Sequence, residues 1–508
     1  MTMVRRQNGT RNQRGVVQSL MRALASPALA RAAMLCAGLM LAGCADMGRF
    51  ETASIALPAP IKQKNSVAQT PAADREHERI LSSYGGSYDD PRIEALITKT
   101  VDRLVAASER PDLTYKVTIL NSGAVNAFAL PTGQLYVTRG LIALASDTSE
   151  LSSVLSHEMA HVLAKHAAIR ENEARKAAIV TRVVTEMGND PDMQALALAK
   201  SKLTLAGFSR AQEFEADGIG VGISARANFD PFGASRFLAA MERNAALKAG
   251  RSPLDPRSQD FLSSHPATPE RVQNAQVNAR QYSSPDSGER DRDTYLAAID
   301  NIVYGEDPSE GFVRGRRFLH PKLGFTFQAP DAYMLENTAQ AVIGVREGGN
   351  QAMRFDVVRV PAEQTLADYL NSGWMEGVDK ASTEDVTING FPAASATASG
   401  DQWQFKIYAL RFGSDVYRFI FATKQKTTES ERNARDTVNS FRRLTLTEIQ
   451  QARPLRIKIL TVKAGDTVET LAAKMTGVDR PVDRFRVLNG LDAKSTVKPR
   501  DKVKIVVD

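Results

Sequence analysis

The chain has 508 residues, of which 43% are hydrophobic and 24% charged, a composition typical of a folded protein of about two to four domains. Of the net charge of +7, six charges come from arginines in the first 44 residues, so the remainder is nearly neutral. A nearly neutral chain has no global attraction for nucleic acid, so we expect no such partner. After residue 44 no apolar run reaches the roughly 18 residues of a membrane span, which excludes a multi-span membrane protein.

The first 44 residues are typical of a secretory signal. Arginines without any acidic residue precede the apolar run "AAMLCAGLMLAG", which ends at Cys44. We therefore exclude residues 1–43 from the predicted fold. A start at Met21 would give a signal of more usual length than a start at Met1, so both starts remain open.

The end of the apolar run, "LAGC", resembles the lipobox of bacterial lipoproteins, in which cleavage before the cysteine follows its diacylation. The alternative is an ordinary signal with an incidental cysteine. Ala45 follows Cys44, where an Asp would resemble the signal for inner-membrane retention. The resemblance therefore implies a periplasmic protein that a lipid on Cys44 anchors in the outer membrane. Because Cys36 also lies in this region, the rest of the chain has no disulfide and no thiol nucleophile.

The remaining chain is predicted to be a multidomain α+β protein. Residues 44–74 are polar and rich in Pro and Ala, so we expect a flexible tether. A mainly helical domain with a small β hairpin or sheet is expected over 75–280 and a linker over 281–314. An α+β domain of unknown role should cover 315–448, and 455–508 alternates strand, helix, helix and strand.

Within the first domain, apolar residues at helical spacing predict a helix from Arg92, followed by a strand at "LTYKVTIL". "VNAFALPTGQLYVTRG" is typical of two strands around Pro131 and Gly133, with a helix after Thr138. The next helix, predicted to be amphipathic, carries "HEMAH", and a long helical stretch with a break near 188–192 follows it. In the α+β domain a turn from Phe412 to Asp415 should join a hairpin, and the predicted strands are "KLGFTFQAP", "AVIGVRE", "RFDVVRV", "DVTINGF", "WQFKIYALRF" and "VYRFIFATK".

The "HEMAH" sequence predicts a zinc site. His157 and His161 are four residues apart, so on a helix both imidazoles can reach a single ion. Glu158 lies about 100° round the helix from His157, where it can take a proton from a water beside the ion. His166 should lie roughly 180° round the same helix and face away.

A zinc site needs a third protein ligand, and the best candidate lies in "AGFSRAQEFEADGIG". Glu213 on a second, antiparallel helix can complete a set of two histidines and one glutamate. Asp217, one turn further, can orient one of the histidines. The alternative is that both carboxylates belong to a solvated acidic face. The longer pattern HExxHxxGxxH fails, because Ala164 and Ala167 stand at its last two fixed positions.

Four separated motifs resemble one family of zinc metallopeptidases, which includes the CAAX prenyl proteases, HtpX and the periplasmic BepA-type proteases. They are "NAFALPTGQLYVTRGL", "HEMAH", "SRAQEFEAD" and "SSHPATPERV", and the similarity covers about residues 75–280. The resemblance implies a gluzincin with one zinc ion per chain. The residues that it implies are the metal ligands His157, His161 and Glu213, the general base and acid Glu158, and Asp217 and Arg210 in supporting or regulatory roles.

The same resemblance implies a regulatory role for His265. His265 can close over the zinc and hold the enzyme latent; the alternative is a loop histidine before a helix. Substrate is expected to add a strand around Ala127–Leu130, with Asn126, Ala127 and Phe128 as binding residues, or along 135–138. The alternative for these strands is a hairpin that serves only the core.

Residues 455–508 resemble a LysM module through "LTVKAGDTVETLAAKM", "LNGL" and "VKPRDKVKIV". Arg500 stands where such modules usually have Gly, so the match is partial. The resemblance implies peptidoglycan binding, and the alternative is a domain that only docks on the rest of the chain.

Together these features predict a lipid-anchored periplasmic zinc endopeptidase that cleaves unfolded or misassembled envelope proteins in outer-membrane protein quality control. The alternative is a latent protease that acts mainly as a chaperone or as an envelope-assembly binding protein. A pseudo-enzyme is expected to have lost Glu158 or a ligand, and this chain keeps all of them.

Overall fold

The computed structural model describes residues 72–508 except for 173–174, 176–207, 249–260, 262–264, 267, 286, 347 and 401. The predicted signal, most of the predicted tether, Cys44 and the predicted helix break near 188–192 lie outside the described residues. Within the described ranges, no helix combines the length and apolar character that a membrane crossing requires.

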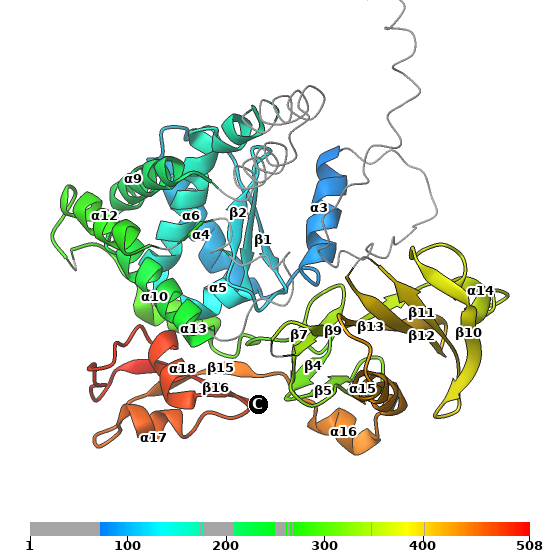
Figure 1. Cartoon of the computed structure of the whole chain (residues 1–508). Helices are drawn as coiled ribbons and strands as arrows, with labels where there is room; N and C mark the ends of the chain where they lie inside the picture. The colour runs from blue at the N-terminus through cyan, green and yellow to red at the C-terminus, as the bar shows by residue number, and fades with distance from the viewer. Residues whose placement is uncertain are drawn as a thin grey trace, which may run out of the picture. The chain divides into compact units, whose positions relative to one another are not determined.

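Helices pack around a small sheet in the region that carries "HEMAH" (Figure 1). The sheet has the order β1-β3-β2, with β3 parallel to β1 and antiparallel to β2. Because β3 is paired on both sides, an added strand cannot lie along 135–138, and that expectation is wrong. The elements are α3 (Ala72–Ser83), α4 (Pro91–Ala107), β1 (Lys116–Leu120), β2 (Ala127–Ala129), β3 (Gln134–Thr138), α5 (Arg139–Leu144), α6 (Thr148–Leu163), α9 (Arg210–Arg226), α10 (Gly233–Lys248), α12 (Pro269–Arg280) and α13 (Arg292–Ile299).

Helix α6, which carries "HEMAH", is buried on every side from Thr148 to His161, whereas the sequence predicted an amphipathic helix. Among its buried polar residues, Ser152, Ser153 and Ser156 donate from their hydroxyls to carbonyls of the preceding turn, so burial leaves these serines satisfied. Helix α9 packs directly on α6, and a Cβ at Gly220 would lie 3.0 Å from the backbone nitrogen of His157. Glycine at this position therefore lets α9 approach the histidine-bearing turn.

The expected linker over 281–314 contains α13, which is part of a core rather than an exposed connection. Tyr295, Leu296 and Ile299 are fully buried in the same apolar cluster as residues of α4 and α6. The Tyr295 hydroxyl donates to the carbonyl of Ile142 over 2.6 Å. The sequence predicted a linker because polar residues flank α13, and so short a helix shows no clear apolar periodicity.

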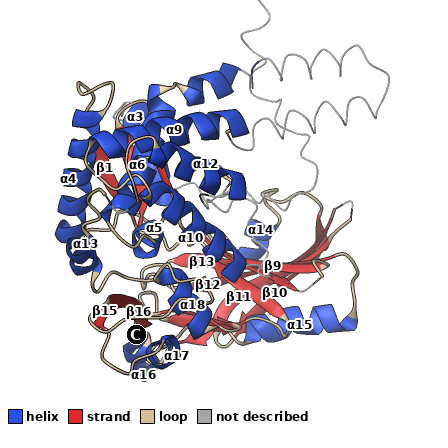
Figure 2. Cartoon of the chain, turned by 90° about the vertical axis from the view of Figure 1, so that its left-hand side faces the viewer, coloured by secondary structure: helices blue, strands red, loops and turns tan. Residues whose placement is uncertain are grey.

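The region over 315–448 is built on a seven-stranded antiparallel sheet of order β10-β11-β12-β13-β9-β8-β7 (Figure 2). The predicted hairpin is confirmed, since Phe412 of β12 pairs with Asp415 of β13. The elements are β4 (Phe312–Arg314), β5 (Arg317–His320), β6 (Phe325–Gln328), β7 (Tyr333–Asn337), β8 (Val342–Arg346), β9 (Gln351–Val358), α14 (Leu366–Leu370), β10 (Val378–Ile388), β11 (Phe391–Ser399), β12 (Gln404–Phe412), β13 (Asp415–Thr423), α15 (Thr428–Asn439), β14 (Arg442–Arg443) and α16 (Leu446–Gln451).

The last segment has the expected strand, helix, helix, strand order: β15 (Arg456–Thr461), α17 (Val468–Ala472), α18 (Pro481–Leu488) and β16 (Lys502–Val507). Lys504 of β16 is fully buried, and its Nζ donates to the carbonyls of Ala143, Leu144 and Ala145 at 2.8, 3.0 and 2.8 Å. Burial lowers the pKa of Lys504 to about 7. The lysine thus caps the end of α5, directly before α6 begins.

Candidate metal centre

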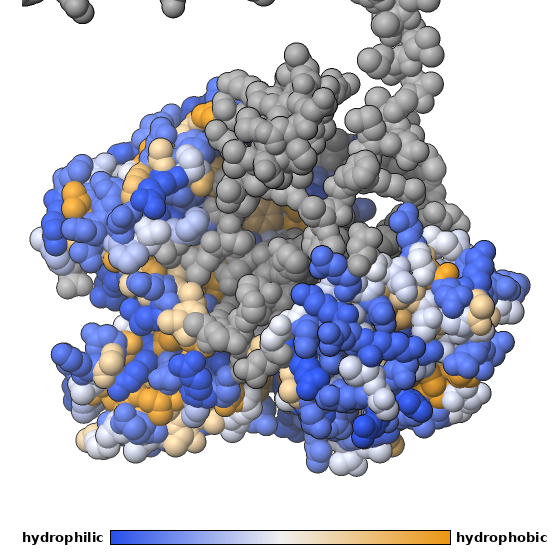
Figure 3. Space-filling view, viewed as in Figure 1, coloured by the Kyte–Doolittle hydropathy of each residue, from blue (hydrophilic) through white to orange (hydrophobic). Residues whose placement is uncertain are grey.

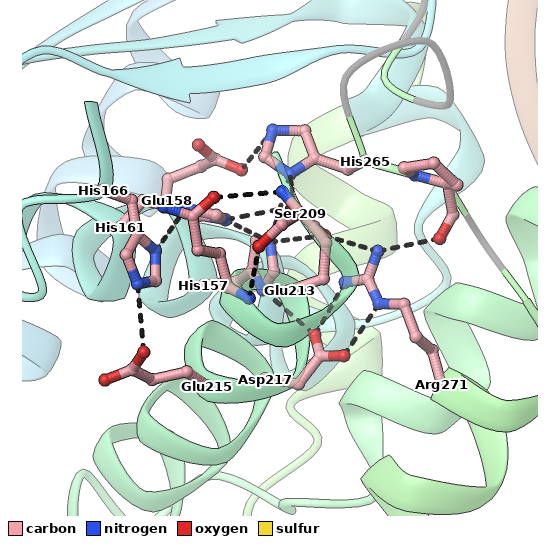
Figure 4. Close-up of polar contacts among 12 residues, drawn as sticks. His157, Glu158, His161, His166, Ser209, Glu213, Glu215, Asp217, His265 and Arg271 are labelled. Carbon is pink, nitrogen blue, oxygen red and sulfur yellow. Dashed lines mark hydrogen bonds and ion pairs between the residues drawn. The ribbon is translucent and has the colours of Figure 1, made fainter. Parts of the chain in front are cut away.

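Buried polar side chains from separate elements converge at one point of the helical region (Figure 4). His157 and His161 come from α6, Glu213 from α9, and His265 from the segment before α12. All four side chains are buried, and one ligand atom from each lies within 4.8 Å of every other. The structure therefore brings together the three predicted ligands and the predicted regulatory histidine.

The spacing of these atoms suits a zinc ion. The Nε2 atoms of His157 and His161 are 3.1 Å apart, and they lie 3.6 and 3.5 Å from the carboxylate oxygens of Glu213. Tetrahedral ligands at about 2.0–2.1 Å from zinc lie about 3.3–3.4 Å from one another. Two facing imidazole nitrogens without a proton between them also need a shared cation to avoid repulsion of their lone pairs. The donor set, two histidines and one glutamate, is one that zinc peptidases use.

Asp217 fixes the orientation of His157. Its Oδ1 lies 3.0 Å from Nδ1 of His157, so the imidazole donates from Nδ1 and keeps Nε2 free for a metal. Burial alone raises the pKa of Asp217, but hydrogen bonds from Arg271 and His157 lower it to about 2. The carboxylate is therefore an anion that accepts both hydrogen bonds.

His166 does not face away, as the sequence predicted, but contacts a ligand. Helix α6 ends at Leu163, and Lys165 takes a left-handed conformation with φ of 55°, which turns the chain back. The Nδ1 atoms of His166 and His161 are 2.9 Å apart, and Nε2 of His166 lies 3.2 Å from Glu215. An Nδ1–H on His161 can donate to His166, which leaves Nε2 of His161 for a metal.

Arg271 on α12 is a positioning residue that the sequence analysis missed. It is 2% exposed, and its guanidinium forms two hydrogen bonds with Asp217, at 2.8 and 2.7 Å. A third nitrogen lies 2.7 Å from Glu213 and also donates to the carbonyl of Pro266 over 3.1 Å. The same side chain thus holds a predicted ligand and the segment next to His265. The signal was present, since Arg271 is the arginine of the quoted "PERV".

Burial sets the charge state of the cluster. It lowers the pKa values of His157 and His161, and lowers the pKa of His265 to about 3, which keeps the imidazoles neutral as metal binding requires. Burial also raises the pKa of Glu213. Burial raises the pKa of Glu158 well above its ordinary value, and the charge of Glu213 raises it further. A carboxyl group with a raised pKa can both accept and return a proton near neutral pH.

Glu158 lies between the cluster and the edge strand β2. The backbone N–H of Ala129 in β2 donates to its carboxylate, and Nε2 of His265 lies 3.7 Å from its Oε1. An extended chain paired with the outer edge of β2 would therefore run past Glu158.

Other predicted residues lie elsewhere. Arg210 is exposed and pairs with Glu270 at 3.1 Å, so the structure does not bring it to the cluster. The side chain of Asn126 donates to the Tyr84 hydroxyl, Ala127 is buried, and Phe128 stacks on Tyr136. The side chains of Asn126 and Ala127 thus serve the core, whereas Phe128 and Ala129 are half-buried.

Two phenylalanines that the sequence analysis missed cover the imidazoles. Phe208 stacks on His161 with 4.0 Å between ring centroids, and Phe261 stacks on His265 at 4.4 Å. These rings contribute to the desolvation that lowers the pKa values of both histidines.

Comparison with known proteins gives an independent view of this region. Residues 91–279 match the model of peptidase family M48. The chain is 27% identical over 204 residues to mitochondrial metalloendopeptidase OMA1 of Schizosaccharomyces pombe. This alignment covers 39% of this chain and 58% of that protein. It is 29% identical over 230 residues to the beta-barrel assembly-enhancing protease of Yersinia pestis, which covers 43% of this chain and 45% of that protein.

The matched region thus spans about half the length of these relatives. Among solved structures, cyanobacterial PsbP from Synechocystis is similar over 26% of this chain and 98% of its own, with 12% identity and a TM-score of 0.21. Such a low score supports no conclusion about fold or function.

Proposed function

Residues 91–279 form a domain of peptidase family M48, and on that premise we propose that the chain is a zinc-dependent endopeptidase that cleaves unfolded or misassembled proteins of the bacterial envelope. The observation that carries the proposal is the buried donor set of His157, His161 and Glu213 with Glu158 beside it. The name of the beta-barrel assembly-enhancing relative supports envelope proteins as the substrates.

The catalytic roles follow from the positions of the side chains. His157, His161 and Glu213 would hold zinc, which would supply a Lewis acid for the scissile carbonyl and would lower the pKa of a water molecule. Glu158 accepts the proton of the attacking water and returns it to the leaving amine. The N–H of Ala129 orients that carboxylate, and the edge of β2 aligns the substrate backbone. Asp217 and His166 fix the two imidazoles.

Removal of the metal should abolish cleavage. Dialysis of the purified protein against 1,10-phenanthroline is expected to lower the cleavage rate of an unfolded protein substrate by roughly a hundredfold or more, because the Lewis acid that polarises the carbonyl is removed. Stoichiometric zinc should restore the rate, with one zinc per chain by elemental analysis. Cleavage that persists in metal-free protein would contradict the proposal.

A latent state is a second proposal, and the position of His265 favours it. Its Nδ1 lies 2.9 Å from Glu213 and 3.4 Å from Nε2 of His157, so it occupies the place of a further ligand. In that state the imidazole would take the position that water and a substrate carbonyl need, and the chain would act as a binding protein or chaperone.

We further propose a lipid anchor at Cys44 and peptidoglycan binding by 455–508. After cell fractionation, the wild type should sediment with the outer membrane and the Cys44→Ser variant should be soluble in the periplasm. The soluble variant should then co-sediment with purified cell-wall sacculi. A membrane-bound Cys44→Ser variant contradicts the anchor, and a variant that stays in the supernatant contradicts peptidoglycan binding.

A further inference from the structure

A groove of about 600 Å³ lies on one face of the seven-stranded sheet, in the domain whose role the proposed function leaves open. Its floor comes from β10, β11, β12 and β13, and α15 supplies one wall. The face of this domain seen in Figure 3 is mostly hydrophilic, with apolar residues only in small separate patches.

The strand register defines which side chains form the floor. Lys406 of β12 pairs with Thr397 of β11 on one side and with Phe421 of β13 on the other, and all three line the groove. Paired residues share a face, so Tyr408, two residues from Lys406, faces the groove as well. The floor thus alternates between hydroxyl, cationic and aromatic groups.

The charges in the groove are unequal. Both carboxylates that line it already face cations, since Glu431 lies 3.0 Å from Lys426 and Glu384 lies 3.9 Å from Lys406. Lys406 is half-buried and donates to the hydroxyl of Ser395 over 2.7 Å. Arg435 on α15 forms no hydrogen bond or ion pair with other described residues through its guanidinium, and its charge acts on Lys406 and Tyr408. One cation beside an aromatic floor is left for a ligand.

The shape suits an extended chain rather than a compact molecule. The groove crosses from β10 to β13, three inter-strand spacings or about 14 Å, which is the length of about four extended residues. Tyr408 and Phe421 can take apolar side chains, and Arg435 can take a carboxylate.

We propose that this groove binds an extended, unfolded polypeptide segment that carries an acidic residue beside apolar ones. The inference rests on the proposed endopeptidase function, because it makes the groove a docking site for unfolded substrates outside the candidate metal centre. A long unfolded substrate would engage both sites, whereas a short peptide would engage only the metal centre. Docking therefore lowers the KM for long substrates and leaves the rate of the chemical step unchanged.

The test compares Arg435→Glu with Arg432→Glu in the full chain. Arg432 is an exposed arginine on the same helix that does not line the groove, so it controls for the change in net charge. For an unfolded acidic protein substrate, Arg435→Glu should raise KM roughly tenfold with kcat unchanged, because a charge-assisted hydrogen bond is lost. For a fluorogenic peptide that spans only the scissile bond, both variants should match the wild type.

A steric variant provides a second measurement. Ser399 is exposed and, by the alternation of β11, faces the groove, so Ser399→Trp should block it without a change of charge. Fluorescence anisotropy of a short labelled peptide of Asp and Leu, measured on the Glu158→Gln form, should show roughly tenfold weaker binding with Arg435→Glu or Ser399→Trp added. A peptide with Lys in place of Asp should bind weakly to every form.

Equal effects of Arg432→Glu and Arg435→Glu, or peptide binding that neither groove variant changes, would overturn the proposal. The binding measurement needs no catalysis. If no form cleaves any substrate but the groove variants still weaken peptide binding, the endopeptidase function is wrong and the groove assignment stands.

Discussion

Glu158→Gln is expected to lower kcat for an unfolded protein substrate roughly a thousandfold while zinc remains bound. The amide has nearly the same shape as the carboxylate, but it cannot accept a proton from water or return one to the leaving amine. Glu158 is not among the predicted ligands, and its Oε1 lies 3.7 Å from Nε2 of His265. Kinetics and elemental analysis of the same preparations therefore separate loss of chemistry from loss of metal.

The control for this variant is Glu242→Gln, the same change at an exposed glutamate on α10. It should retain the wild-type rate and the wild-type zinc content. If Glu158→Gln cleaves the substrate at the wild-type rate, Glu158 is not the proton carrier and the proposed mechanism is wrong. If Glu158→Gln instead loses both activity and zinc, the glutamate supports metal binding rather than proton transfer.

The sequence predicted local features of the site better than their surroundings. Helical spacing indicates which side of α6 carries His157 and His161, because that spacing depends only on helix geometry. The end of the same helix depends on the left-handed conformation of Lys165, which no residue pattern indicates, so the contact of His166 with His161 could not be foreseen. Arg271 lies 54 residues from Asp217, and only the packing of α12 beside α9 brings them together.

The strand predictions show the same limit. β12 and β13 contain β-branched and aromatic residues and were predicted together with the turn that joins them. β11 was missed because its sequence "FPAASATAS" is rich in small residues with low β propensity. Its place between β10 and β12 lets those alanines pack in the sheet interior, which is a consequence of tertiary structure rather than of local preference.

His265→Ala is expected to raise the initial rate of cleavage by roughly tenfold. The imidazole contacts Glu213 and His157, so on the latency proposal it takes the position that water and the substrate carbonyl need, and an open state requires the imidazole to withdraw. If the closed state is about 1.4 kcal/mol more stable than the open one, about one molecule in ten is competent, and removal of the imidazole makes all of them competent.

His265→Cys is the matched comparison, because a thiolate can still bind zinc from the same position while its side chain is smaller than an imidazole. It should remain latent if His265 acts as a ligand, whereas it should be as active as His265→Ala if the imidazole acts only by its bulk. Both variants should keep the wild-type zinc content, because Arg271 still positions Glu213 in each. The comparison holds only if they do. A rate for His265→Ala that equals or falls below the wild-type rate, with zinc bound, would exclude latency through this histidine and leave it a packing partner of Phe261.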